Sequence, residues 1–363
     1  MTIVAILIIG FSVLQLIVAL MNLLPAASLP KAGEISSDLV SVLIPARNEE
    51  KNIGTILSDL AAQDYKNIEI LVFDDQSEDS TGEIVREFAR SEQRIRLVSS
   101  EGLPEGWLGK NHACSVLSGL AHGDFLLFLD ADVRIRNNTI GRAVSFAKKH
   151  GLSLISIFPK QIIISAGEKV TVPNMNYILL SLLPLHLVMK SGFPSLSAAN
   201  GQFMFFNANA YRAIHPHELF RADKVEDIST AREMKRRGMK IACLAGDDDM
   251  SCRMYNGFRD AVSGFSKNVI AFFGNSFLLA VLFWLITTFG FLAVLTALPA
   301  GLFIIYLAVY LLARIFISIA SHQNVAENIL YIFPLQLTMG IFIYRAFINK
   351  HFSSFRWKGR NIK

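Results

Sequence analysis

The stretch DFLLFLDADV, residues 124–133, combines a continuous apolar run with two carboxylates that follow it directly. Such a run is typical of a strand buried on both faces, as in a parallel sheet covered by helices. Asp130 and Asp132 come at the carboxyl end of that strand, which is the end where open parallel sheets bind ligands. Neighbouring carboxylates repel each other unless a cation or a hydrogen-bond donor is near. The stretch therefore predicts a cation site.

Strands and helices alternate around this stretch. Apolar runs predict strands over residues 39–44, 67–75, 94–100, 124–130 and 151–158. Helical patterns predict helices over residues 49–63, 77–90 and 109–123. Strands that are almost continuously apolar, with helices between them, predict an α/β fold with a Rossmann-like, mostly parallel sheet.

Two further polar clusters follow predicted strands at the same edge of the sheet. Residues 45–50, PARNEE, follow the first strand, and residues 74–80, DDQSEDS, follow the second. Hard cations such as Mg²⁺ and Mn²⁺ prefer oxygen ligands and often complete their shell with substrate phosphates. The convergence of the clusters favours such a cation at Asp130 and Asp132. The alternative is that these acids cap a turn, as Asp often does.

Apolar stretches flank this region on both sides. They cover residues 3–24, 276–301, 302–320 and 329–347. Segments of this length can cross a bilayer as helices. The first predicts an N-terminal transmembrane anchor over residues 1–27, with a cleaved signal peptide as the alternative, although a basic start is absent.

Charge and cysteine content narrow the class of protein further. The net charge is +5, and the chain from Arg345 onward holds six basic residues and no acid. A basic segment beside a membrane helix is typical of the cytoplasmic face, so residues 350–363 predict a basic cytoplasmic tail. Basic and aromatic residues do not interleave elsewhere, which argues against nucleic acid as a partner. Cys114, Cys243 and Cys252 have neither a metal-site spacing nor a disulfide pattern.

The membrane topology contains a conflict. If the domain between the first two apolar stretches is cytoplasmic, three full crossings after residue 276 would place the basic tail on the other face. We therefore expect residues 329–347, which contain Pro334 and Gln336, to form a re-entrant or interfacial hairpin. The tail would then return to the cytoplasmic face.

Several motifs occur in the order of a known family. They are SVLIPARNEE (41–50), VFDDQSEDST (72–81), GKNHA (109–113), LDADV (129–133) and VED (225–227). This order resembles the inverting, nucleotide-sugar-dependent glycosyltransferases of the GT-A fold, family 2. The motifs CRMYNGF (252–258) and FRWKGR (355–360) are similar to those of a membrane-anchored branch that includes carotenoid (diaponeurosporenoate) and hopanoid-associated glycosyltransferases.

The resemblance implies a role for each matching position. It places around the nucleotide of the donor Pro45, Ala46, Glu49, Asp75, Lys110, Asp130 and Arg253. Within this set, Asp75 would accept a hydrogen bond from uracil and Asp130 would approach the ribose. Asp132, with Asp130, would hold Mg²⁺ or Mn²⁺. Glu226 and Asp227 resemble the catalytic acidic motif, with Asp227 as the general base. The processive QxxRW pattern is absent, which implies transfer of a single sugar.

Structural alternatives stay open for these residues. Asp74 and Asp75 would also suit a turn cap, and Lys110 a solvated helix start. Glu226 and Asp227 precede a helical pattern, where acids interact favourably with the helix dipole. The run GDDDMSC, 246–252, suggests a second metal cluster, although an acidic turn is the preferred interpretation.

The acceptor is expected to be a membrane lipid. Residues 175–194 are strongly apolar inside the water-soluble region and predict an interfacial amphipathic helix. A multi-pass enzyme of the cell membrane, with its catalytic domain facing the cytoplasm, needs no water-soluble acceptor. Candidate acceptors are a carotenoid, a hopanoid, a polyprenyl phosphate and a glycerolipid. The sequence leaves the sugar and the oligomeric state open.

The predicted domains follow from these assignments. After the anchor come a GT-A domain over residues 28–270, a membrane region over residues 271–349 with two or three segments, and the tail. Within the GT-A domain, residues 38–135 form the nucleotide-binding half and residues 136–270 the acceptor half. Rival functions are a membrane-bound nucleotidyltransferase, which the missing glycine-rich phosphate loop disfavours, and a transporter or scaffold with a degenerate nucleotide-binding domain.

Overall fold

A computed structural model describes residues 1–24, 27–31, 36–352, 355–357 and 360–362. Its contacts divide the chain into two compact units, which are described separately. The sheet unit comprises Pro25–Lys160 and Leu185–Cys252. The helical unit comprises Met1–Leu24, Gln161–Pro184 and Arg253–Lys363.

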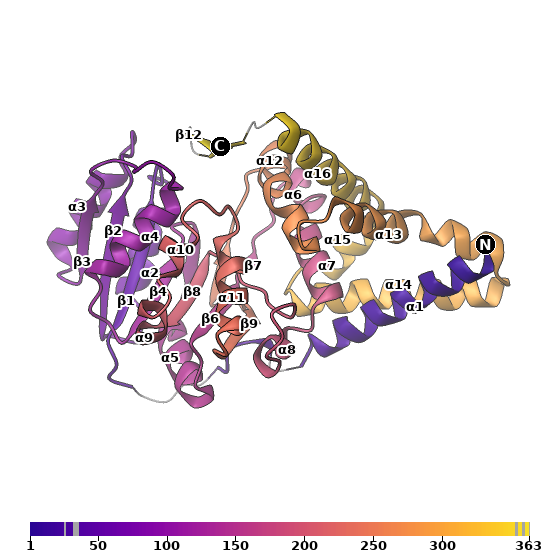
Figure 1. The fold of residues 1–363 in the computed structure, drawn as a ribbon, viewed down its shortest axis with the longest axis horizontal. Coiled ribbons are helices and arrows are strands. Elements are labelled where there is room, and N and C mark those ends of the chain that lie inside the picture. Colours follow the sequence, from indigo (N-terminus) through magenta and orange to yellow (C-terminus); the bar gives the residue numbers. More distant parts are fainter. Residues whose placement is uncertain (25–26, 32–35, 353–354, 358–359, 363) are drawn as a thin grey trace. The chain divides into compact units, whose positions relative to one another are not determined.

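A seven-stranded sheet forms the centre of the sheet unit, in the order β3-β2-β1-β4-β8-β6-β9 (Figure 1). The bounds are β1 Val40–Ala46, β2 Ile68–Asp74, β3 Ile95–Ser99, β4 Phe125–Leu129, β6 Leu154–Phe158, β8 Phe203–Asn207 and β9 Ile241–Ala245. Every residue of β4 is buried, and β1 is buried except at Pro45. The apolar composition of both strands is thus explained by cover on both faces.

The sheet is mostly parallel, as predicted, with one exception. β1 is parallel to β2 and β4, β2 to β3, and β6 to β9. β8 is antiparallel to both β4 and β6. This strand was absent from the sequence prediction, and its reversed direction places its beginning beside the carboxyl end of β4.

Helices connect these strands, and a small three-stranded sheet lies beyond β4. The helices of the sheet unit are α2 Ile53–Ala61, α3 Thr81–Ser91, α4 Gly109–Leu120, α5 Thr139–His150, α8 Leu185–Lys190, α9 Ala208–Arg212, α10 Pro216–Leu219 and α11 Glu226–Arg236. β5 Val133–Ile135 pairs antiparallel with β10 Met250–Cys252. β7, Lys160–Gln161, lies at the point where the chain passes from one unit to the other.

The helical unit contains four helices that are long and apolar enough to cross a membrane. They are α1 Thr2–Met21, α13 Phe277–Ala297, α14 Ala300–Ala320 and α16 Ile332–Phe352. Shorter elements complete the unit: α6 Ala166–Lys169, α7 Pro173–Leu182, α12 Phe258–Asn268, η2 Val269–Phe273, α15 Val325–Leu330, β11 Phe355–Trp357 and β12 Arg360–Ile362. The predicted tail includes residues 353–354, 358–359 and 363, which lie outside the described residues.

Side-chain contacts show the directions of the long helices. Phe11 of α1 packs on Phe283 of α13, and Ile8 lies beside Gly290, so α1 and α13 are antiparallel. The chain therefore leaves α1 and enters α13 at the same end of the bundle.

α16 is antiparallel to α13 and lies along its first half. Gln336, near the start of α16, accepts a hydrogen bond from Thr288 in the middle of α13. Phe347 packs edge to face on Phe277 at the beginning of α13. The end of α16 thus lies at the end of the bundle where α13 begins. Pro334 does not interrupt α16, which is continuous, because a proline in the first helical turn removes no intrahelical hydrogen bond.

The segment predicted as an interfacial helix, 175–194, takes a different form. It contains most of α7 and all of α8, which belong to different units. α7 is buried on nearly all sides and packs against α1, α14 and α16. The polar side chain of Asn174 is tolerated in this buried helix because it donates hydrogen bonds to the Leu335 carbonyl and the Thr338 hydroxyl.

The two units also cut across the predicted domain boundaries. The region predicted as one GT-A domain, 28–270, contributes Gln161–Pro184 and the chain from Arg253 to the helical unit. The chain leaves the sheet unit after Lys160 and returns to it at Leu185, and the intervening α7 is buried against the long helices of the helical unit.

Candidate active site

The centre of the site lies where β4 ends and β8 begins. Leu129 pairs with Phe203 in the antiparallel register, and the backbone N–H of Asp130 donates to the carbonyl of Gln202 over 3.1 Å. This pairing brings the polar residues before β8 next to the Asp130–Asp132 stretch. The sheet topology therefore assembles the site from segments about seventy residues apart.

Lys110, at the start of α4, joins these two segments. Its Nζ lies 2.6 Å from Oδ1 of Asp130 and donates to the carbonyl of Gly201 over 3.1 Å. Burial alone would lower the pKa of Lys110, but the negative charges of Asp130 and Glu226 outweigh it and raise that pKa. Lys110 therefore lies at a helix start, as the alternative interpretation has it, but its ammonium is paired with an acid rather than only solvated.

Glu226 and Asp227 begin α11 and face the same cluster. The Gly201 N–H donates to Oδ2 of Asp227 over 2.9 Å, and the Ile228 N–H donates to Oδ1 over 2.8 Å. Burial, and then the charge of Asp227, raise the pKa of Glu226 to about 8. Burial also raises the pKa of Asp227. The pair thus starts a helix, as the alternative interpretation has it, and also takes part in the cluster. The catalytic role of the two acids stays a prediction.

Gly201 is the residue of this cluster that sequence reasoning missed. Its carbonyl and its N–H bind Lys110 and Asp227, respectively. A Cβ at this position would lie 3.2 Å from Nζ of Lys110 and 3.3 Å from Oε1 of Glu226, closer than ordinary contact. A glycine between two polar residues, two positions before the start of an apolar run, as in NGQFMFF, is the signal that could have indicated it.

Asp132 lies deeper in the same site. Burial, and then the charges of Asp130 and Glu49, raise its pKa to about 7. Within the described part of the chain, its Oδ1 is buried without a hydrogen-bond partner. The Cys252 thiol donates to the Asp132 carboxylate and accepts from Nε2 of Gln202 over 3.0 Å. Cys252 and Gln202 were not predicted as members of the site.

These carboxylates fit a hard divalent cation. A buried carboxylate oxygen without a donor, beside a second carboxylate, is an environment that a cation stabilises. Among the residues described, no group of three or more His, Cys, Asp or Glu side chains could hold a metal alone. A divalent ion here would need further oxygens from a substrate, as Mg²⁺ often does at phosphate sites. The fit thus favours an ion that binds together with a phosphate-bearing ligand.

The residues predicted around the nucleoside lie at the ends of β1 and β2. The N–H of Asp75 donates to the carbonyl of Ala46 over 2.8 Å, so these two residues are neighbours. Arg47 Nη1 donates to the Asp75 carbonyl over 2.5 Å and fixes the backbone there. Asp75 is buried, and Pro45, one residue before Ala46, is half-buried.

The turn-cap alternative holds for Asp74. Oδ1 of Asp74 accepts from the Ser77 N–H over 3.0 Å. Glu49 accepts from Nδ2 of Asn52, and its charge acts on Asp132. Glu49 therefore links the predicted nucleoside residues to the acids that are predicted to bind metal. Whether Pro45, Ala46, Glu49 and Asp75 bind a nucleoside stays a prediction.

Arg253 lies in the helical unit rather than in the sheet unit. Its Nη2 donates to Oε1 of Glu168 over 2.9 Å, and Glu168 is fully buried. The structure thus gives Arg253 a partner within its own unit. Its predicted contact with the diphosphate stays a prediction.

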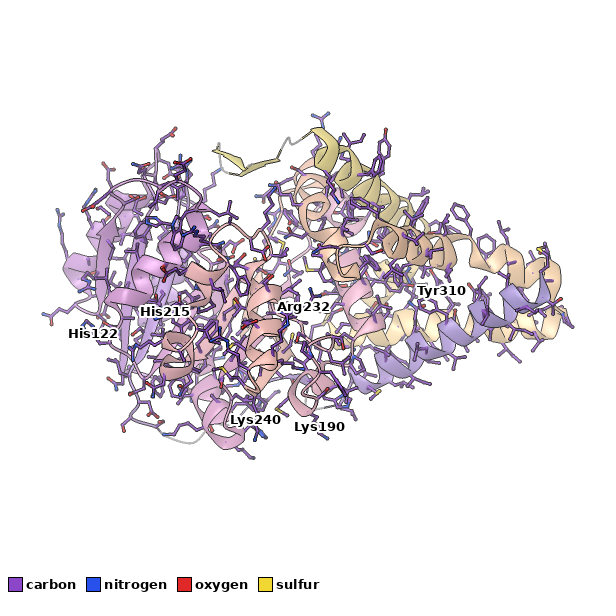
Figure 2. All side chains as sticks on the ribbon, in the orientation of Figure 1. His122, Lys190, His215, Arg232, Lys240 and Tyr310 are labelled. Carbon is purple, nitrogen blue, oxygen red and sulfur yellow. The ribbon has the colours of Figure 1, made fainter. Side chains whose placement is uncertain are left out.

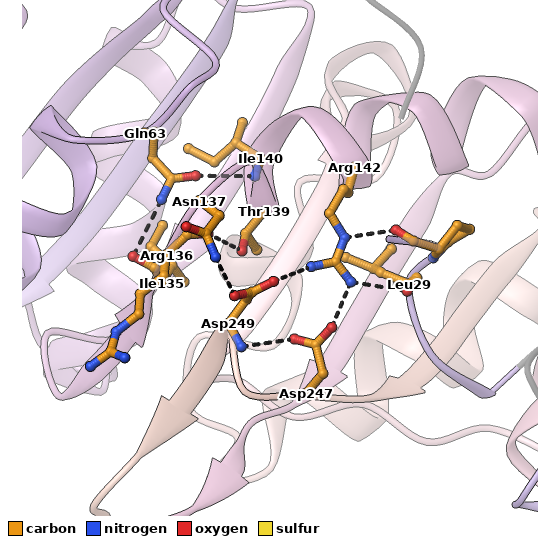
Figure 3. Close-up of polar contacts among 11 residues, drawn as sticks. Leu29, Gln63, Ile135, Arg136, Asn137, Thr139, Ile140, Arg142, Asp247 and Asp249 are labelled. Atoms are coloured by element: carbon orange, nitrogen blue, oxygen red, sulfur yellow. Dashed lines mark hydrogen bonds and ion pairs between the residues drawn. The ribbon is translucent and has the colours of Figure 1, made fainter. Parts of the chain in front are cut away.

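The second acidic cluster is a turn held by Arg142 (Figure 3). The two guanidinium ends of Arg142 pair with Asp249 over 2.8 Å and with Asp247 over 2.6 Å. Arg142 also donates to the carbonyls of Leu29 and Pro30. A buried cation already compensates these acids, so the acidic-turn interpretation is supported over a second metal site.

Comparisons with known proteins agree with this architecture. Residues 41–214 match the Glycosyl transferase family 2 domain. The chain carries a family 2 glycosyltransferase domain. Its fold is the GT-A fold: it resembles a mannosyltransferase from Pyrobaculum calidifontis, solved in complex with GDP-Man and Mn²⁺, with a TM-score of 0.57, 16% identity, and 96% and 99% of the two chains covered. At this identity the likeness shows the fold alone.

Two relatives of this chain share one name. A 4,4'-diaponeurosporenoate glycosyltransferase of Staphylococcus haemolyticus is 28% identical over 66% of this chain and 63% of its own length. This match therefore spans slightly less than two thirds of that relative. A protein of the same name from Staphylococcus aureus is 24% identical over 88% of this chain and 87% of its own length.

Proposed function

We propose that this protein transfers a single sugar from a nucleotide-sugar, a UDP-hexose, to a lipid-like acceptor, with inversion at the anomeric carbon. The family 2 domain and the GT-A fold support the reaction class. The observation that carries the proposal is the cluster in which Lys110 and Gly201 join Asp130 to Asp227. It places a cation, a predicted metal ligand and a predicted base in one site.

Asp132 and Asp130 would hold Mg²⁺ or Mn²⁺. Such an ion neutralises the charge that develops on the departing nucleotide diphosphate. Lys110, already paired with Asp130, supplies a second positive charge near the same place. The buried oxygen of Asp132 supports this assignment, because it has no donor among the described residues.

Asp227 is proposed as the general base. In an inverting transfer the acceptor attacks the anomeric carbon on the face opposite the diphosphate, and a base takes the proton of an acceptor hydroxyl. The raised pKa of Glu226, about 8, keeps a proton on Glu226 at neutral pH. The backbone N–H groups of Gly201 and Ile228 fix the orientation of Asp227. An acceptor carboxylate would need no base.

The acceptor is proposed to be a membrane lipid, such as a carotenoid or a hopanoid. Four helices of the chain are long and apolar enough to cross a bilayer, and two relatives are named as diaponeurosporenoate glycosyltransferases. Polyprenyl phosphate and glycerolipid acceptors are alternatives that a lipid-transfer assay separates.

The sheet unit is proposed to face the cytoplasm, where nucleotide-sugars are made. The end of α16 lies at the end of the bundle where α13 begins, so the basic tail leaves on the face from which the chain entered α13. A reporter fused after Lys363 should then be cytoplasmic. A periplasmic reporter would contradict this orientation.

Release of the nucleotide tests the proposed reaction. Purified protein with UDP-glucose, Mn²⁺ and a lipid extract should release UDP, and Asp132→Ala should abolish the release. GDP-mannose in place of UDP-glucose tests the nucleotide preference. Release of pyrophosphate from a nucleoside triphosphate would instead indicate a nucleotidyltransferase. Equal UDP release by Asp132→Ala would overturn the site assignment.

A further inference from the structure

Arg314 is a buried charge inside a helix that can cross the membrane. It lies in α14 and is 4% exposed. Its guanidinium carbon stacks 3.4 Å from the centre of the Tyr177 ring, and Nη2 donates to the hydroxyl of Tyr310 over 3.1 Å. Tyr310 lies among the helices of this unit (Figure 2). An ionisable side chain at such a position is costly and is generally retained for binding or transport.

The helical unit offers Arg314 no acidic partner. Its sequence contains three acids, Glu168, Asp260 and Glu327. Each is engaged elsewhere: Glu168 with Arg253, Glu327 with Lys169, and Asp260 with the N–H of Asn256. Among the described residues, Arg314 forms no ion pair. Within this part of the chain, its positive charge contacts the rings of Tyr177 and Tyr310 and the hydroxyl of Tyr310.

The polar groups around Arg314 are rich in donors. Nε of Arg314 is buried and has no hydrogen-bond partner within the described residues. The Tyr177 hydroxyl accepts from Gln15, and the Tyr310 hydroxyl accepts from Gln336. A guanidinium has five N–H donors and no acceptor. A surplus of donors with one positive charge, in an apolar surrounding, is an environment that suits an anion.

The depth of Arg314 suits the head of a lipid. Gln15 lies six positions before the end of α1, and Arg314 lies six positions before the end of α14. At the rise of an α-helix, both distances are about 9 Å. The end of α1 is also where the chain leaves towards the sheet unit. The cluster thus lies in the half of the bundle near that end rather than at its middle.

We infer that Arg314, with Tyr177 and Tyr310, binds the anionic head, carboxylate or phosphate, of a membrane lipid. This inference rests on the proposed function, because it assigns a chemical class to the lipid acceptor. The Tyr rings and the Arg charge would orient the head, and the surrounding helices would contact the apolar chain. A purely structural Arg–Tyr stack would show no preference between anionic and neutral lipids.

Lipid binding by the full-length protein in phosphatidylcholine nanodiscs tests the inference. Radiolabelled oleate, at a pH where it is ionised, is compared with methyl oleate, in the absence of nucleotide-sugar. We expect oleate to bind at least about tenfold more tightly. Arg314→Gln should remove this preference, and Arg314→Lys should keep part of it. Arg345→Gln, which removes an exposed arginine of α16, should leave the preference unchanged.

Competitors identify the source of the anion. Displacement of oleate by phosphatidic acid, but by neither diacylglycerol nor inorganic phosphate, would support an anionic lipid head. Displacement by inorganic phosphate as well would show that a free anion suffices and would overturn the lipid assignment. The comparison of oleate with methyl oleate uses the wild-type protein and so does not depend on the folding of any variant. Equal binding of the two lipids by the wild type, or binding of neither, would refute the inference. UDP release is measured separately, so failure here leaves the transfer reaction standing.

Discussion

The ammonium of Lys110 lies 2.6 Å from a carboxylate oxygen of Asp130, the first acid after the central strand of the sheet. The pairing reduces the repulsion among the acids at this edge of the sheet, because the cation of Lys110 interacts with both Asp130 and Glu226. It also ties the start of α4 to the end of β4, so the geometry of the site depends on both elements.

Lys110→Met is expected to lower the rate of sugar transfer by about 100-fold, the typical effect of removing one stabilising donor. The charge of Lys110 lowers the pKa values of Asp132 and Asp227. Its loss should raise both values, so the acidic limb of the pH–rate profile should move to higher pH. UDP release across a pH series measures both effects.

Lys148→Met provides the control for this prediction. Lys148 is an exposed lysine that pairs with Asp38 on the surface of the sheet unit. Its removal should change neither the rate nor the profile. A Lys110→Met protein with the wild-type rate and profile would show that the ion pair with Asp130 is only structural.

Gly201→Ala is expected to reduce transfer at least about tenfold while the protein stays folded. The new Cβ would lie 3.2 Å from Lys110 Nζ and 3.3 Å from Glu226 Oε1, so the neighbouring side chains must move, and misplaced catalytic groups react slowly. Gly119→Ala is the matched control, because nothing lies within 4 Å of a Cβ there. That variant should keep its rate and gain roughly 0.5–1 kcal/mol of stability, since it lies in a helix. Equal rates for both alanine variants would contradict the role of Gly201.

The sequence allowed prediction of the strand-end part of the site because that part is local. The apolar run 125–129 predicts a buried strand, and the chain that follows it must carry Asp130 and Asp132 at the ligand-binding edge. The same reasoning holds for Ala46 and Asp75 at the ends of β1 and β2. Each inference needs only one segment and the general rule for parallel sheets.

The parts that were missed depend on pairing between distant segments. Gly201 reaches Lys110 because β8 inserts antiparallel between β4 and β6, and the sequence of β8 does not specify its direction. Arg314 is visible in the sequence as a charge in an apolar stretch, but its partner Tyr177 comes from an insert that precedes it by more than one hundred residues. Pairings of this kind are set by packing of the whole chain.

Arg142→Gln is expected to lower the free energy of unfolding by about 3 kcal/mol, the typical cost of breaking a buried ion pair. Arg142 is buried and bonds both Asp247 and Asp249, as well as the backbone at Leu29 and Pro30 (Figure 3). Removing the guanidinium leaves two acids uncompensated. Chemical denaturation of the full-length protein in detergent measures the change.

Arg136→Gln is the control for the Arg142 variant. Arg136 is an exposed arginine three residues before Thr139, so its substitution should change stability by less than roughly 0.5 kcal/mol. If added divalent metal restored the stability of Arg142→Gln, the acids of residues 247–249 would be shown to bind a cation after all. If both arginine variants lost the same stability, the buried ion pairs of Arg142 would contribute no more to folding than a surface arginine does.

Glu168→Gln tests the buried ion pair with Arg253. Burial alone would raise the pKa of Glu168, but the hydrogen bonds from Arg253 and from the backbone of Ile164 and Ser165 outweigh it and lower the pKa to about 2. A carboxyl whose pKa falls from 4.5 to about 2 on folding stabilises the folded state by roughly 3 kcal/mol. That contribution is complete above pH 4.5 and is lost as the pH falls towards 2. Glu168→Gln should therefore unfold more easily at pH 7, and the difference from wild type should shrink as the pH falls below 4.5.

Glu233→Gln, which breaks a surface pair with Arg237, should cost less than about 1 kcal/mol. A Glu168→Gln deficit that stays constant from pH 7 to pH 3 would show that packing, rather than the ionised carboxylate, is the source of the stability.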